Sequence, residues 1–117
     1  MANYQLEYSQ IVRRKLKSLR AYLKAEYGED VSKTAIKKIT DAARGLQKFP
    51  NKGVDLSSIF DIDTDYKYFL VSPNYIFYYI EDDTVYIAEM FNEREDFMYQ
   101  LFGIHSHTSE SEDYWGE

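Results

Sequence analysis

Large apolar residues fall in two different patterns along the chain, one helical and one typical of strands. The strand pattern occupies residues 66–91, where runs rich in Tyr, Phe, Val and Ile, at 66–72, 75–81 and 84–91, are separated by short polar turns. Alternating aromatic and β-branched residues with turn residues between the runs are typical of an antiparallel β-meander. We therefore predict three consecutive strands here and place the core of the domain on them.

A strand and a helix are predicted at the start of the chain. Residues 4–8 alternate apolar and polar, which indicates a strand with one buried face. Ser9 can then cap a helix, and Gly28 suits the left-handed residue that ends one. The apolar positions between them recur at spacings of three or four, which predicts one buried face, made of Val12, Leu16, Leu19, Leu23 and Tyr27.

A second helix is predicted between Gly28 and Pro50. Asp30 or Ser32 can cap it, and Pro50 stops it. Because the link between the two helices is short, we expect an antiparallel helical hairpin that packs on the meander. The apolar face of the second helix would consist of Val31, Ala35, Ile39, Ala42, Leu46 and Phe49.

The remaining segments complete the predicted architecture. Residues 55–65 fit either a short strand or an irregular loop, and residues 92–103 fit a short final helix or a packed extended end. From residue 104 the sequence becomes polar and acidic, so we expect 104–117 to be a disordered tail. The prediction is a single α+β domain, residues 1–103, with the helical hairpin on one face of a mostly antiparallel sheet of 4–5 strands.

Charge is divided unevenly between the two halves of the chain. Residues 1–50 contain 11 Lys or Arg against 5 Asp or Glu, whereas residues 51–117 contain 3 against 15. A basic half can contact nucleic acid or another acidic target, although a solvated helical face gives the same pattern. The basic residues that could form such a contact lie on the first predicted helix: Arg13, Arg14, Lys17, Arg20 and Lys24.

Neither metal nor cofactor chemistry is predicted. The alternating carboxylates at 61, 63 and 65 resemble the start of a calcium loop, but Tyr66 occupies the glycine position and Ser72 the final glutamate position. His105 and His107 lie in the predicted tail without a third ligand nearby. The chain has no cysteine, no apparent signal peptide and no apolar run long enough to span a membrane, so we expect a cytoplasmic protein.

Three residues in the second half are candidates for phosphate chemistry. Lys67 falls in a predicted strand among aromatic residues, and Arg94 follows the last strand between two glutamates. Either cation could bind a phosphate or stabilise charge that develops on one. For Arg94, which lies beside carboxylates, a structural ion pair is the alternative. Tyr99 is the third candidate, and the tyrosines of the meander could stack nucleobases or simply pack.

The order and spacing of several phrases resemble the RelE/ParE superfamily of bacterial toxins from type II toxin–antitoxin pairs. These phrases are YSQIVRRKLKSLRAYL, GLQKFPNKG, YKYFLVSPNYIFYYI, TVYIAEMF and NEREDFMYQLFG, which together extend from Tyr4 to about Gly103. The resemblance implies the α+β fold described above and a cognate antitoxin as partner. It also implies one of two targets.

Relatives that cut messenger RNA on the ribosome use a cluster of basic residues and a tyrosine, without metal. On matching positions, Lys67 and Arg94 correspond to two of these basic residues, and Tyr99 corresponds to the tyrosine with a one-residue shift. Such relatives carry two further basic residues, at the positions that correspond to Phe69 and Ile76 in this chain. Roughly half of the catalytic cluster is therefore matched.

The ParE-like branch poisons DNA gyrase and needs no catalytic cluster. The long predicted hairpin and the phrase GLQKFPNKG are more similar to that branch, so gyrase is slightly favoured as the target over the ribosome. An inactive relative that only binds an antitoxin is the third possibility. The sequence indicates neither the oligomeric state nor the surface that an antitoxin covers.

Overall fold

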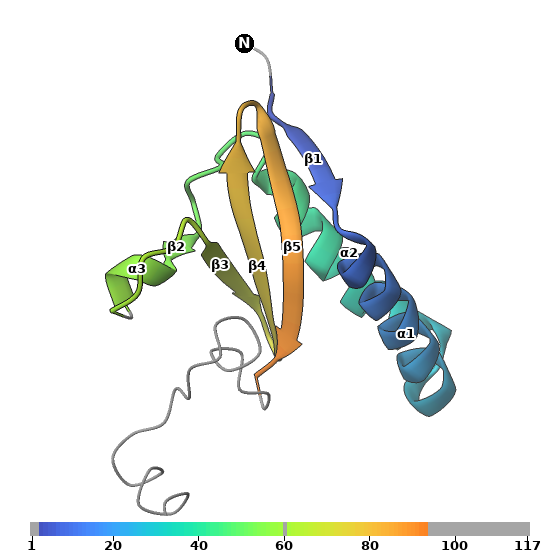
Figure 1. The fold of residues 1–117 in the computed structure, drawn as a ribbon. Coiled ribbons are helices and arrows are strands. Elements are labelled where there is room, and N and C mark those ends of the chain that lie inside the picture. Colours follow the sequence, from blue (N-terminus) through green and yellow to red (C-terminus); the bar gives the residue numbers. More distant parts are fainter. Residues whose placement is uncertain (1–2, 60, 94–117) are drawn as a thin grey trace, which may run out of the picture.

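The computed structural model of the chain describes residues 3–59 and 61–93. Within these residues the fold is one sheet with a helical hairpin on one of its faces, as Figure 1 shows. The strands are β1 (Gln5–Tyr8), β2 (Val54–Asp55), β3 (Lys67–Val71), β4 (Asn74–Glu81) and β5 (Thr84–Asn92). The helices are α1 (Gln10–Tyr27), α2 (Glu29–Gly45) and the single turn α3 (Leu56–Ile59).

The sheet has five strands in the order β1-β5-β4-β3-β2. β3, β4 and β5 form the predicted meander, and β2 adds to its β3 edge in antiparallel orientation. β1 pairs with the other edge and runs parallel to β5. The prediction of an α+β domain with a mostly antiparallel sheet of 4–5 strands is confirmed. The predicted C-terminal helix and the tail, residues 104–117, lie outside the described residues.

The hairpin begins at the predicted cap but turns differently from the prediction. The Ser9 hydroxyl accepts a hydrogen bond from the Val12 N–H at 3.1 Å, which satisfies a free donor in the first turn of α1. Gly28 has a φ of 98°, a value that favours glycine, and it both ends α1 and precedes α2. Capping of the second helix by Asp30 or Ser32 is wrong. The buried Ser32 hydroxyl instead donates to the Arg20 carbonyl at 2.9 Å and joins the two helices.

The main core lies between the hairpin and the sheet. Its buried residues come from both helices, β4 and β5: Val12, Ile39, Ala43, Leu46, Ile76, Tyr78, Val85, Ile87 and Met90. Ile36 and Ala43, rather than Ala35 and Ala42, are the buried neighbours of Ile39 on α2. The apolar face of α2 therefore differs from the predicted one at these two positions, whereas Ile39 is buried as predicted.

Three residues that the apolar pattern placed in the core are exposed. Tyr27 and Val31 are 62% and 45% exposed, because the end of the hairpin extends beyond the sheet (Figure 1). Phe49 is 64% exposed because α2 ends at Gly45, so helical spacing no longer applies. These predictions were wrong because periodicity cannot show where the partner surface ends.

Candidate functional site

The face of the sheet opposite the hairpin carries a continuous layer of aromatic rings. Tyr79 stacks on Tyr66 and on Tyr86, with ring centroids 5.9 and 5.2 Å apart. A second group of rings surrounds the buried Phe77 and includes Tyr68, Tyr75 and Phe91. We call these seven residues the aromatic face. Alternation along β4 directs Tyr75, Phe77 and Tyr79 to this side and Ile76, Tyr78 and Ile80 to the hairpin.

The tyrosine rings of the aromatic face are uncharged at neutral pH, and the Glu89 carboxylate lies near them. Burial raises the pKa of Tyr66, and the neighbouring Tyr79 and Glu89 raise it further, so its hydroxyl keeps its proton at neutral pH. A neutral ring with a nearby carboxylate offers no attraction to a phosphate backbone. Among the described residues, Lys15 brings a cation to this face, over the Phe91 ring, but its ammonium group is paired with Glu89.

Lys67, the first candidate catalytic residue, is engaged by a carboxylate. It is the first residue of β3 and lies opposite Asp55 of β2, and its ammonium group donates to the Asp55 carboxylate. The Lys67 side chain is only 17% exposed. Sequence reasoning missed Asp55 as its partner, because only the β2–β3 register brings the two together. Arg94 and Tyr99, the other two candidates, lie outside the described residues.

The basic residues predicted to contact a target are exposed on α1, as expected from their positions outside the apolar face. Arg13, Lys17 and Arg20 recur at spacings of four and three and therefore form one stripe along the helix. They border a shallow pocket between the two helices whose apolar lining includes Leu16 and Ile36. Lys24 continues the stripe but pairs with Glu29 at 3.3 Å. Arg14 lies apart from the stripe, in a groove beside the sheet.

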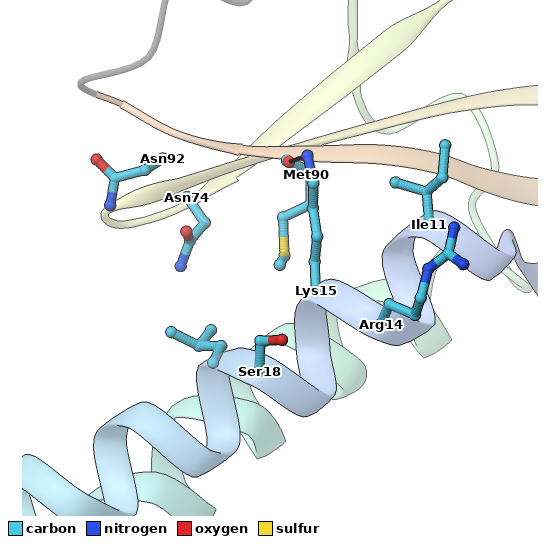
Figure 2. Close-up of a pocket in the computed structure, with 8 residues that line it drawn as sticks. Ile11, Arg14, Lys15, Ser18, Asn74, Met90 and Asn92 are labelled. Carbon is cyan, nitrogen blue, oxygen red and sulfur yellow. Dashed lines mark hydrogen bonds between the residues drawn. The ribbon is translucent and has the colours of Figure 1, made fainter.

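Lys15 makes contacts at the sheet edge that the sequence analysis missed. β1 covers one side of β5 only as far as Ile87, and beyond that point no strand of residues 3–59 and 61–93 pairs with this side of β5. The Lys15 ammonium crosses this edge, donates to the Met90 carbonyl at 2.8 Å and to the Glu89 carboxylate at 3.0 Å, and lies 4.1 Å from the centre of the Phe91 ring. Figure 2 shows its side chain extending from α1 towards β5 beside Met90. Lys15 blocks an edge to which another strand could pair.

A groove separates α1 from the ends of β4 and β5. Asn74 and Asn92 lie at one end of it and Ile11 and Arg14 at the other, with Met90 projecting from β5 towards α1 (Figure 2). The groove continues between the end of the hairpin and the β3–β4 turn, where the exposed Tyr22, Tyr27 and Val31 line it. Exposed apolar side chains gathered along one groove are typical of a protein-binding surface.

Residues 3–59 and 61–93 hold neither a metal-ligand cluster nor a membrane-spanning helix. They contain no group of three or more His, Cys, Asp or Glu side chains placed to hold a metal ion. The same residues include no helix of sufficient length and apolar character to cross a bilayer. His105 and His107 lie outside the described residues.

Comparison with known proteins identifies the family. The model of the ParE toxin of the type II toxin–antitoxin system, parDE, matches residues 6–97. A solved chain described as belonging to the chromosomal ParDE TA system from P. aeruginosa has a similar fold, with a TM-score of 0.64 and 14% identity, over 76% of this chain and 95% of that one. No curated protein matches. Because the family model covers most of the chain, the protein belongs to the ParE toxin family of type II toxin–antitoxin systems.

Proposed function

We propose that this protein is a toxin that arrests bacterial growth by binding and poisoning DNA gyrase, and that a cognate antitoxin neutralises it. The observation that carries the choice of target is the engagement of the Lys67 ammonium group by the Asp55 carboxylate. A nuclease of the RelE type needs several free cations around the scissile phosphate. Poisoning by binding needs none.

Burial at the positions that correspond to the catalytic cluster also argues against RNA cleavage. RNA-cutting relatives carry additional basic residues at the positions of Phe69 and Ile76. In this chain Ile76 lies in the core beneath the hairpin and Phe69 packs against it. Asp55 would have to release Lys67 before that ammonium group could reach a phosphate. Among the described residues, Arg13, Lys17 and Arg20 form a stripe of cations on α1 that pairs with no carboxylate, and we assign this stripe to contact with the target.

The antitoxin would occupy the groove beside α1. A disordered antitoxin segment that folds on binding needs an elongated apolar surface to compensate for its loss of conformational entropy. The groove offers Tyr22, Tyr27 and Val31 at one end and the side chain of Met90 at the other. Gyrase and the antitoxin are cytoplasmic in bacteria, so we place the action of the toxin there.

The test is to compare the two targets directly with purified protein. The expected result is inhibition of gyrase supercoiling, with no cleavage of messages on translating ribosomes. Charge reversal of the stripe, Arg13→Glu with Lys17→Glu, should weaken the inhibition, whereas the same reversal at Lys48 and Lys52 should not. Cut messages together with unaffected supercoiling would overturn the proposal.

A further inference from the structure

We propose that the acidic end of this chain, residues 110–115, docks on the basic stripe of α1 and fills the shallow pocket beside it. The inference goes beyond the proposed function, because it concerns how the chain covers its own target-binding surface. It depends on the pairing state of the stripe, the composition of the pocket, the sequence of the chain end and the length of the connecting segment.

The stripe is a cationic surface without ion-pair partners in the part of the chain that the structure describes. None of the ion pairs and hydrogen bonds within the described residues involves the side chains of Arg13, Lys17 or Arg20. All three residues are exposed, and successive members are three or four residues apart, so about one helical turn separates neighbours. Three adjacent like charges repel one another, and an acidic segment lying along them would remove that repulsion.

The pocket beside the stripe has an apolar interior and a basic rim. The apolar surface of the pocket comes from Tyr8, Leu16 and Ile36. The three basic residues of the stripe border the pocket. A flat aromatic side chain inserted here would bury apolar area and also contact arginine guanidinium groups, which interact favourably with aromatic faces. The pocket therefore favours an occupant that combines carboxylates with an aromatic ring.

The end of the chain has this composition. Three carboxylates, one for each basic residue of the stripe, come from Glu110, Glu112 and Asp113. Two aromatic residues, Tyr114 and Trp115, follow immediately. Each exposed ion pair contributes little by itself, about 0–1 kcal/mol. A segment tethered to the same molecule nevertheless binds at an effective concentration in the millimolar range, so weak contacts suffice for occupancy.

The connecting segment is long enough. Glu93, the last described residue, lies beside the β3–β4 turn, where its N–H donates to the Pro73 carbonyl at 2.7 Å. The preceding Asn92 lines the same groove as Arg14 of α1, so the chain leaves the sheet next to this helix. About 16 residues separate Glu93 from Glu110 and can span roughly 50 Å when extended. The stripe lies round the side of α1, a helix about 10–12 Å across.

Trp115 is the only tryptophan of the chain and reports on the docking directly. The measurement is acrylamide quenching of its fluorescence in the full chain. At low salt the ring should be shielded, and the quenching constant should rise about twofold or more near 1 M salt, where the screening length falls to about 3 Å. The triple variant Arg13→Glu, Lys17→Glu and Arg20→Glu should show the high quenching constant already at low salt.

Two further variants make the test independent of misfolding on α1. Reversal at Lys38, Lys48 and Lys52 changes the net charge equally at exposed sites away from the stripe and should leave the shielding intact. Reversal of the three tail carboxylates to lysine should release the ring without touching the folded domain. Combining both triple reversals, on the stripe and on the tail, should restore shielding.

Three outcomes would overturn the proposal. The first is a Trp115 ring as accessible in the unmodified chain at low salt as in the reversed variants. The second is equal release by the control reversal. The third is shielding that disappears on dilution, which would show that the tail binds a second copy. Because the readout requires neither gyrase nor growth arrest, its failure is distinguishable from failure of the proposed function.

Discussion

Replacing Tyr78 by phenylalanine should remove the anchor that joins the segment after α2 to the sheet. The buried Tyr78 hydroxyl accepts from the Gly53 N–H at 2.9 Å and donates to the Pro50 carbonyl at 2.8 Å. Phenylalanine would leave two backbone groups without partners at a site with little access to water, and each such group costs about 1–3 kcal/mol. Because Gly53 is only half-buried, we expect a total loss of about 2–3 kcal/mol in the free energy of unfolding.

Urea denaturation measures this loss. With a slope of about 1–3 kcal/mol per M, the midpoint should fall by about 0.7–3 M without a change of slope. The matched control is Tyr79→Phe, which removes the same atom from the adjacent strand position, where the hydroxyl makes no hydrogen bond within the described residues; it should change stability by less than about 0.5 kcal/mol. Equal stability of the two variants would refute the proposed anchoring of residues 50–53.

Three further predictions concern the same framework. Lys15→Met should cost about 1 kcal/mol and promote self-association through the uncovered β5 edge, whereas Lys17→Met should do neither; urea denaturation and light scattering measure the two effects. Gly53→Ala should lower the thermal midpoint, because a Cβ there would lie 2.5 Å from the Tyr78 hydroxyl oxygen and 2.9 Å from the Tyr68 carbonyl oxygen. Burial raises the pKa of Tyr78 and of Tyr8 above the ordinary value of about 10, so the unfolded chain releases these protons first. The contribution of these two protonated tyrosines to the free energy of unfolding should therefore be complete below about pH 10 and fall as pH rises through their folded pKa values. Denaturation at about pH 9 and pH 11 should show this fall, and Tyr78→Phe should reduce it.

The sequence predicted the elements better than their surroundings. The meander was predictable because strand alternation and turn residues are local signals, and Ser9 was recognisable as a cap for the same reason. The exposure of Tyr27 and Val31 was not, because it depends on where the sheet ends beneath the hairpin. β2 is too short to produce a periodic signal, with only two residues.

The candidate site shows the same division between local and tertiary information. The α1 stripe was predicted as basic and exposed, since helical spacing alone separates it from the apolar face. The pairing of Lys67 with Asp55 required the β2–β3 register. The position of Lys15 at the β5 edge required knowledge that β1 stops at Tyr8. Contacts between distant segments thus decide which cations are free, and single-sequence patterns do not encode them.

The most direct test of the account compares two single variants in a gyrase supercoiling assay with purified toxin. Lys67→Ala should keep full inhibition, because Lys67 serves as an ion-pair partner of Asp55. Arg20→Glu should weaken the inhibition, because Arg20 belongs to the free stripe of α1. Loss of toxicity in Lys67→Ala with an intact fold, together with message cleavage by the unmodified protein, would contradict the account.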